Sequence, residues 1–400
     1  MSTSFEPGAP AGAGFVPLCV PEVGGNEWRY VKECLDTGWV SSVGSYVDRF
    51  ERECAARAGT RHAVATVNGT AALHIALLVA GVRPDDEVII PTLTFIATAN
   101  AVRYARAWPL FMDAEPEHWQ MDIAKLRSFL ETECDWRDGE LRNRGTGRRV
   151  SAIVPVHILG HPTDMDPLLA LARQFSLRVI EDATESIGAG YRGRKIGSLG
   201  DLACFSFNGN KVITTGGGGM VVTDNDAFAR QAKYLTTQAK DDPLEYVHHA
   251  VGYNYRLPNL LAAMGCAQLE RLDDFIARKR SLATTYTAAL CDMPGLHLPR
   301  AASWADSIWW LYSVEVDAAI YGEDSRALLK RLGTAQIQAR PLWQPMHQSP
   351  AHAAAPRRSC PVADHLHTTV LSLPSSVGLS AADQDRVIVA LRRGGAAAAK

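Results

Sequence analysis

Residues 206–220 read SFNGNKVITTGGGGM, in which Lys211 stands shortly before four consecutive glycines. Two kinds of site fit this stretch. Glycines let backbone N–H groups approach an anion, so the stretch could be a phosphate-binding loop. Lys211 could instead be an amine nucleophile in a tight turn before an apolar strand at residues 220–223, where burial would favour imine formation.

The pattern of a P-loop, G-x-x-x-x-G-K-[ST], does not match, because Lys211 precedes the glycines and no Ser or Thr follows it directly. A lysine in a solvated loop is the ordinary alternative. Four successive glycines cost backbone entropy, however, so we expect a second chain segment or a ligand to approach the backbone closely here.

An apolar run at residues 177–180 leads directly into two carboxylates, Glu181 and Asp182. Asp182 stands 29 residues before Lys211. In open α/β sheets, ligands lie at the carboxyl ends of the strands. The cofactor pyridoxal 5'-phosphate (PLP) needs a carboxylate there, because an ionised Asp keeps its pyridine nitrogen protonated. An acidic strand-to-loop junction without a ligand is the alternative.

Gly69 and Thr70 follow Asn68 at the start of an apolar helical pattern. The N-terminus of a helix binds phosphate through its free N–H groups and its dipole. An ordinary helix cap explains Asn68 and Thr70 equally simply. The order of the three features, a phosphate-type helix start, then a strand-end Asp, then a lysine, favours a PLP site.

Short apolar runs of strand length alternate with helical patterns along the chain, which predicts an α/β fold with a mainly parallel sheet. Residues 131–149 are charged and contain glycine, so we expect a surface excursion there. The strands are expected at residues 87–90, 150–156 and 177–180, and the helices at residues 70–79, 95–104 and 165–175.

The length of 400 residues suits one large domain plus a smaller one. We expect a disordered segment at residues 1–14, a large domain at 15–268, a small C-terminal α/β domain at 269–393 and a tail at 394–400. A long charged helical pattern at residues 269–289 is interpreted as the bridge between the two domains.

The bulk composition limits the possible partners. The formal net charge is −2, so no basic excess favours binding to nucleic acid or to an anionic membrane. No apolar run approaches the roughly 20 residues of a membrane span. The eight cysteines are scattered without a C-x-x-C pair, and the N-terminus has no secretory pattern, so we expect a cytoplasmic protein with reduced thiols.

From about residue 16 to residue 390, the chain resembles the DegT/DnrJ/EryC1/StrS family of sugar aminotransferases, a branch of the fold-type I PLP enzymes. Within that family, the LegC-like group is similar in GGNEW at residues 24–28, TGWVSS at 37–42, and the stretch at 206–220. The resemblance implies a large PLP-binding domain with a mainly parallel mixed sheet and a smaller C-terminal α/β domain.

The resemblance also implies the roles of the cofactor-binding residues. Lys211 carries PLP as a Schiff base and then shuttles a proton between the amino donor and the cofactor. Asp182 pairs with the pyridine nitrogen. The phosphate is held by Gly69, Thr70 and Ser206.

Three further residues take cofactor roles by the same resemblance. Phe95 stacks on the cofactor ring, although an ordinary core position is the alternative. Asn254 is the asparagine that the partner subunit lends to the phosphate, which implies a homodimer with shared sites. Glu185 stands where the family often has Gln or His beside the cofactor's 3'-oxygen, so it is either protonated or turned towards another group.

The substrate contacts are expected at Trp39, Ser41, Arg340 and His347, for each of which packing or surface charge is an equal alternative. His365 and His367 lack the ligand cluster that a metal site needs, so we expect no metal.

By resemblance, the enzyme moves an amino group from glutamate to C4 of a nucleotide-linked 4-keto-6-deoxy sugar. The LegC-like motifs point to a UDP-linked sugar and to nonulosonic acid or surface polysaccharide biosynthesis. A GDP-perosamine synthase, a 3-keto sugar aminotransferase and a non-catalytic PLP-binding regulator are the alternatives. The related sugar 3-dehydratase carries His in place of the lysine, so Lys211 favours transamination.

Overall fold

The computed structural model describes residues 14–242, 244–356 and 358–395, and its centre is a seven-stranded sheet. The strand order is β1-β11-β10-β7-β6-β2-β3, and every neighbouring pair is parallel except those made by β11. The mainly parallel sheet is therefore confirmed. The strands are β1 (His62–Thr66), β2 (Glu87–Pro91), β3 (Trp108–Met112), β6 (Val150–Ile153), β7 (Arg178–Asp182), β10 (Leu202–Ser206) and β11 (Gly219–Thr223).

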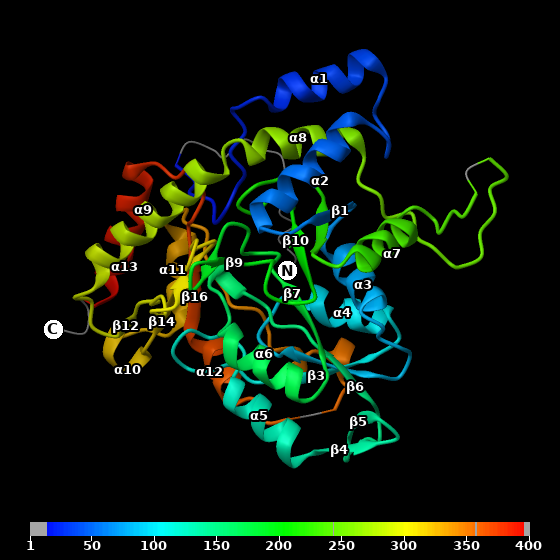
Figure 1. Ribbon diagram of the computed structural model, residues 1–400. Helices are drawn as coiled ribbons and strands as arrows, with labels where there is room; N and C mark the ends of the chain where they lie inside the picture. Colours follow the sequence, from blue (N-terminus) through cyan, green and yellow to red (C-terminus); the bar gives the residue numbers. More distant parts are fainter. Residues whose placement is uncertain (1–13, 243, 357, 396–400) are drawn as a thin grey trace.

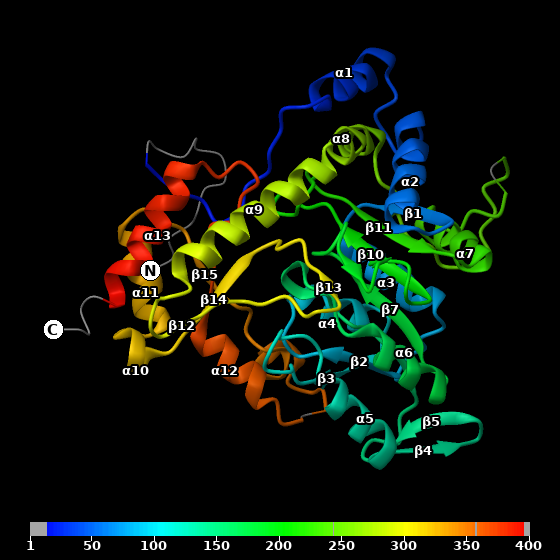
Figure 2. The ribbon, with the colours of Figure 1, turned by 60° about the vertical axis from the view of Figure 1, so that its left-hand side comes forward.

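Helices cover both faces of this sheet, because its strands are apolar on both sides (Figures 1 and 2). Along β10, Ala203 and Phe205 pack with one core, and Leu202 and Cys204 pack with the other. One layer holds α3 (Gly69–Val79), α4 (Ile96–Tyr104) and α7 (Asp226–Thr236), and the other holds α2 (Ser45–Ala58), α5 (Ile123–Thr132), α6 (Met165–Gln174) and α8 (Asn259–Leu269).

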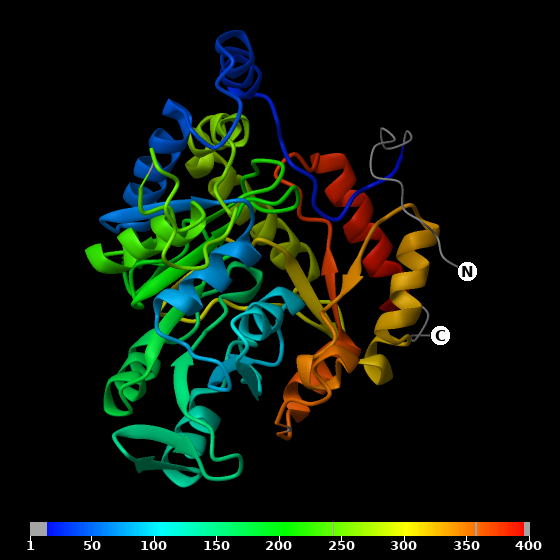
Figure 3. The ribbon, with the colours of Figure 1, turned by 90° about the vertical axis from the view of Figure 1, so that its right-hand side faces the viewer.

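A smaller unit follows α9 (Leu272–Leu290) and lies beside the large sheet (Figures 1 and 3). Its antiparallel sheet has the order β12-β14-β16-β15 and its own apolar core, which also includes Val16. The boundary expected at residues 268–269 stays a prediction. The unit contains β12 (Leu296–His297), β14 (Tyr312–Val316), β15 (Arg340–Pro341), β16 (Val370–Leu373), α10 (Ala318–Tyr321), α11 (Ser325–Thr334), α12 (Pro361–Thr369) and α13 (Ala381–Gly395).

The structure differs from the expected elements at three places. Residues 131–149 contain an antiparallel hairpin of β4 (Cys134–Arg137) and β5 (Glu140–Asn143). The helix expected at residues 269–289 is α9, which begins three residues later, at Leu272, because Leu269 is the last residue of α8. The tail expected from residue 394 is helical as far as Gly395. Residues 1–13 of the segment expected to be disordered and residues 396–400 of the expected tail lie outside the described residues.

The remaining elements are peripheral to the two sheets. They are α1 (Glu27–Thr37), β8 (Gly190–Tyr191), β9 (Arg194–Lys195), β13 (Ala305–Asp306) and the 3-10 turns η1 (Ile158–Gly160), η2 (Met346–Gln348) and η3 (Pro350–His352).

None of the described helices combines the length and apolar character that crossing a membrane requires.

Candidate active site

A cavity of about 340 Å³ opens where β7 and β10 end and where α3 and α4 begin. The carboxyl ends of parallel strands are the expected place for a ligand in such a sheet. The structure brings seven of the expected cofactor residues together in its wall: Gly69, Thr70, Phe95, Asp182, Glu185, Ser206 and Lys211.

Lys211 lies in the loop between β10 and β11, and its side chain is 14% exposed. Its Nζ lies 3.4 Å from Oε1 of Glu185 and 4.2 Å from the centroid of the Trp310 ring. The amine therefore faces the cavity between a carboxyl group and an aromatic face, rather than bulk solvent.

Asp182 is the last residue of β7 and is almost fully buried. Its Oδ2 accepts a hydrogen bond of 2.7 Å from the Thr98 hydroxyl, and its Oδ1 accepts one of 3.2 Å from the Thr184 N–H. Thr98 is in the first turn of α4, so a helix and a strand together fix this carboxylate. These two donors orient both oxygens of the acid at the cavity floor, where the group can face a ligand cation.

Glu185 is buried three residues after Asp182. Burial is the main reason that the pKa of its carboxyl is raised, and Lys211 opposes that shift. Its Oε2 accepts a hydrogen bond of 2.9 Å from the Leu159 N–H, so its two oxygens face the backbone of η1 and the amine of Lys211. Its contact with the 3'-oxygen of the cofactor stays a prediction.

The start of α3 provides a place for an anion. Asn68 caps the helix by accepting a hydrogen bond of 2.8 Å from the Ala71 N–H. A Cβ on Gly69 would lie only 2.8 Å from Cβ of Ser206, so a glycine is needed where the helix start meets the end of β10. The hydroxyl-bearing Thr70 and Ser206 line the cavity beside this helix N-terminus.

The close approach of a second chain segment is confirmed at one of the four glycines. A Cβ on Gly219 would lie 2.4 Å from the carbonyl oxygen of Asn68, so β11 lies directly against the capped start of α3. A Cβ on Gly218 would lie 2.3 Å from the hydroxyl of Thr215 in the same loop, and one on Gly217 would meet nothing within 4 Å. Gly216 has a φ of +81°, in the left-handed region that favours glycine.

The fit of these groups to PLP can be judged from their chemistry. An amine, a buried carboxylate and a helix N-terminus with two nearby hydroxyls line one cavity, and these are the groups that an aldehyde, a pyridinium and a phosphate require. Phe95 is 55% exposed at the rim, so its ring is free to cover a bound aromatic ring. The residues present fit the cofactor.

The structure does not place the remaining expected residues in this cavity. Trp39 and Ser41 are exposed after α1, and Asn259 holds both through their backbone carbonyls at 2.7 and 2.6 Å. Asn254 and Arg340 are also exposed. Their contacts with cofactor or substrate stay predictions.

His347 is held by residues of its own chain. Its Nδ1 lies 2.8 Å from the hydroxyl of Thr92, and its Nε2 lies 3.0 Å from Oδ1 of Asp364. It therefore ties η2 to the end of β2 and does not line the cavity. His365 pairs with Glu315, and no group of three or more His, Cys, Asp or Glu side chains that could hold a metal occurs in the described part of the chain.

Among the cavity-lining residues to which sequence reasoning gave no role are Thr98, Trp310 and Trp343. Thr98 had a usable signal, because it is a polar residue one turn after Phe95 in an expected helix. The two tryptophans come from the smaller unit, so only the tertiary fold brings them to the site.

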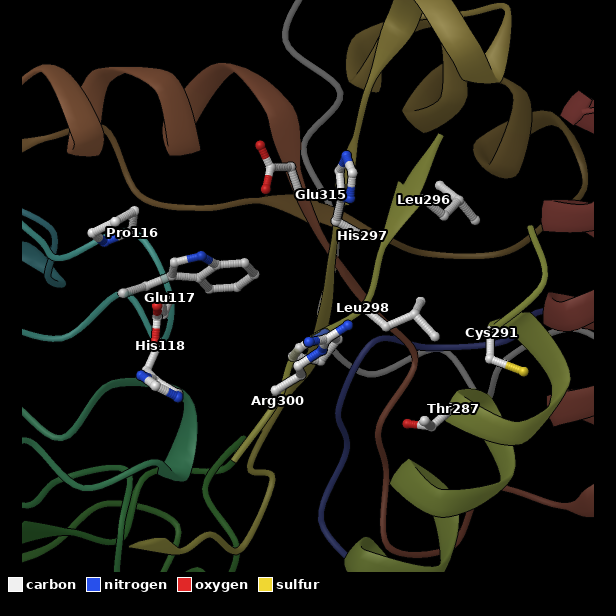
Figure 4. Close-up of a pocket in the computed structure, with 12 residues that line it drawn as sticks. Pro116, Glu117, His118, Thr287, Cys291, Leu296, His297, Leu298, Arg300 and Glu315 are labelled. Atoms are coloured by element: carbon white, nitrogen blue, oxygen red, sulfur yellow. The ribbon is translucent and has the colours of Figure 1, made fainter. Parts of the chain in front are cut away.

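Another hollow, of about 570 Å³, lies between the loop at residues 116–119 and the smaller unit. Figure 4 shows the side chains of Glu117, His118, His297 and Arg300 around it. It contains none of the expected site residues, so the cavity at Lys211 is the candidate active site.

The fold and this cavity define a fold-type I PLP-dependent enzyme. The chain belongs to the DegT/DnrJ/EryC1/StrS aminotransferase family, whose sequence model matches residues 21–392. It is therefore a PLP-dependent sugar aminotransferase.

Curated relatives and solved structures are similar over nearly the whole chain. A GDP-perosamine synthase of Caulobacter vibrioides is 41% identical, covering 94% of this chain and 97% of the relative. A GDP-perosamine synthase of Escherichia coli O157:H7 is 37% identical over 92% and 94% of the two chains. The crystal structure of DesV from S. venezuelae is 33% identical with a TM-score of 0.83, covering 92% of this chain and 94% of that one.

Proposed function

We propose that this enzyme moves an amino group from glutamate to C4 of a GDP-linked 4-keto-6-deoxy sugar. The observation that carries the reaction class is Lys211 facing the same cavity as the buried carboxylate of Asp182. The choice of GDP as the nucleotide is supported by the relatives. Three GDP-perosamine synthases are 41%, 37% and 35% identical to this chain over more than nine tenths of their length. They favour this substrate over the UDP-linked sugar expected from the LegC-like motifs.

Each cofactor-binding residue has a distinct part in this proposal. Asp182 would hold the pyridinium proton, and the start of α3 would bind the phosphate through the N–H groups of Gly69 and Thr70 and through the Thr70 and Ser206 hydroxyls. Phe95 would cover the cofactor ring and exclude water. When bound, PLP supplies an electron sink that stabilises negative charge at the carbon losing its proton.

Lys211 performs the proton transfers. Its Nζ takes the proton from Cα of glutamate in the first half-reaction and delivers a proton to C4 of the sugar in the second. Glu185, 3.4 Å away, and the ring of Trp310, 4.2 Å away, define the space in which this amine moves. The reaction is placed in the cytoplasm, where glutamate and nucleotide sugars are available.

We infer that two copies of the chain share their active sites. The segment between α7 and α8 projects from the body of the molecule (Figure 1). Asn254 pairs with Thr237 at the base of this segment, is exposed and does not line the cavity of its own chain. Large apolar side chains are exposed on this segment and near α1, as expected of a surface that a partner covers. They include Trp28 (76% exposed), Trp39 (58%), Val43 (68%), Leu244 (86%) and Val251 (82%).

The test uses purified enzyme loaded with PLP. Glutamate should bleach the visible absorbance band of the bound cofactor, and Lys211→Ala should abolish both that change and turnover. Mass spectrometry of the products from GDP-, UDP- and dTDP-linked keto sugars then identifies the substrate. A band that glutamate leaves unchanged would favour a non-catalytic PLP-binding protein, and turnover of the UDP-linked sugar alone would reject GDP.

A further inference from the structure

Trp310 brings an aromatic face from the smaller unit to the amine of Lys211. It lies just before β14, is 3% exposed and lines the active-site cavity. The centroid of its ring is 4.2 Å from Nζ of Lys211, within the range in which a ring attracts an ammonium group. Because the site excludes much of the solvent, this attraction is stronger than at a surface.

The ring is fixed from two directions. Its indole N–H donates a hydrogen bond of 2.7 Å to the carbonyl of Asn210, the residue before the lysine. Its own backbone carbonyl accepts one of 2.8 Å from Nζ of Lys279, a fully buried lysine on α9 that also binds the carbonyl of Ser375 at 2.6 Å. Trp310 therefore contacts both the backbone beside Lys211, at the carbonyl of Asn210, and the amine at the end of the Lys211 side chain.

We propose that Trp310 is a positioning residue that holds the protonated amine of Lys211 in place between its two proton transfers. The inference rests on the proposed aminotransferase function. Lysine has a flexible four-carbon stem, so its amine needs contacts at its end to remain near the reacting carbon. The ring attracts the ammonium form and has little attraction for the neutral amine, so it retains Lys211 after proton uptake and releases it once the proton has been delivered.

The first measurement is steady-state kinetics of Trp310→Leu, Trp310→Phe and the matched control Trp309→Leu. Trp309 is the adjacent tryptophan, partly buried near Tyr312 and absent from the wall of the active-site cavity. We expect kcat of Trp310→Leu to fall about 10- to 100-fold, because a displaced catalytic group costs rate rather than affinity. KM for glutamate should change less than about threefold, and Trp310→Phe should recover most of kcat because it retains a ring face.

The second measurement needs no cofactor and no turnover. In the cofactor-free protein, acetic anhydride at a fixed pH should acetylate Lys211 about two- to fivefold faster in Trp310→Leu, since the amine is no longer held against the face of the ring. Mass spectrometry of the peptide that contains Lys211 gives this rate. A smaller side chain could also speed acetylation simply by exposing the amine. Trp310→Phe is smaller than Trp but retains a ring face, so its acetylation rate should remain within about twofold of the wild type. Trp310→Met replaces Trp310→Leu if circular dichroism shows that the latter does not fold.

The outcomes separate the two proposals. If the wild type shows no cofactor band, or if glutamate leaves the band unchanged, the proposed function fails whatever Trp310 does. If the wild type is active while Trp310→Leu matches Trp309→Leu in both kcat and acetylation rate, only the positioning role is overturned. A fall in kcat that Trp310→Phe does not relieve also overturns it, because a loss of packing would then explain the result.

Discussion

At the scale of single residues, the carboxylate of Asp182 depends on a neighbour on another element. The Thr98 hydroxyl donates to its Oδ2 at 2.7 Å, and the Thr184 N–H donates to its Oδ1. These two hydrogen bonds fix both oxygens while the group remains almost fully buried. The orientation of the acid, and not only its charge, is therefore built into the site.

We expect Asp182→Asn to lower kcat by at least about 10²-fold, because an amide cannot stabilise a pyridinium proton as an ionised acid does. Thr98→Val should lower kcat about fivefold, the effect of losing roughly one hydrogen bond. Stopped-flow absorbance of the glutamate half-reaction measures both. Equal effects of the two substitutions would contradict the different roles given to the acid and its donor.

Glu185 provides a test against pH. Burial raises the pKa of its carboxyl, so the folded protein binds a proton there more tightly than the unfolded chain does. The carboxyl therefore lowers the free energy of unfolding progressively as pH rises towards and through the pKa that the group has in the folded protein. Below the pKa of the unfolded chain, about 4.3, this loss of stability is absent. Glu185→Gln should raise the Tm of the cofactor-free protein at neutral pH, and the gain should shrink as pH falls.

Glu181, a buried carboxyl near the end of β7, is the matched control. Burial would raise the pKa of its carboxyl, but His157 and the N–H groups of Gly200 and Gly197 lower it overall. Glu181→Gln should therefore lower the Tm at neutral pH, the opposite sign, and that loss should shrink as pH falls through the depressed pKa. Thermal unfolding of both variants between about pH 3 and pH 8 is the measurement, and Tm shifts of the same sign at neutral pH would disprove the assignment.

At the scale of elements, β11 and the start of α3 are in contact through Gly219. Because its Cβ would lie 2.4 Å from the carbonyl oxygen of Asn68, Gly219→Ala should destabilise the fold by about 1–3 kcal/mol and weaken cofactor binding. Gly217→Ala should stay within about 0.5 kcal/mol of the wild type, since its Cβ would meet nothing within 4 Å. Urea unfolding and PLP titration measure the two effects, and equal losses would show that the contact at Asn68 is not the cause.

The elements also show what a single sequence reveals. The expected helix at residues 70–79 is α3, and the strand expected at 177–180 is β7, because each is a long apolar run with a marked end. The break between α8 and α9 could not be predicted, since residues 270 and 271 include neither Gly nor Pro.

The same limit applies to the site. Gly69, Asp182 and Lys211 could be placed because each belongs to a local motif. Thr98 offered only its position on an expected helix, and Trp310 offered no local signal, because their partners lie 84 and 100 residues away in the chain. Such contacts depend on the order of the strands, which no local pattern records.

At the scale of the whole molecule, shared sites make a mixing experiment possible. Asn254→Asp would put a carboxylate beside the phosphate of the partner's cofactor, so we expect it to lower activity about 10²-fold at limiting PLP. Lys211→Ala should be inactive. When the two variants are unfolded together and refolded, the mixed dimer should contain one intact site and restore up to about a quarter of wild-type activity.

The controls are each variant refolded alone, and a mixture of the two that is never unfolded. Size-exclusion chromatography with light scattering gives the oligomeric state in parallel. No recovery after refolding, in samples that are dimeric, would show that Asn254 acts within its own chain or has no part in the site.

The buried ammonium of Lys279 also governs how the molecule melts. Its two acceptors are the carbonyls of Trp310 and Ser375, which lie at the same end of the paired strands β14 and β16, while the lysine itself belongs to the long helix α9. Detaching the smaller unit would break both of these buried hydrogen bonds, at a cost of about 1.5–3 kcal/mol each. A half-melted chain is therefore strongly disfavoured, and heat should denature both units in one cooperative transition whose calorimetric and van't Hoff enthalpies agree.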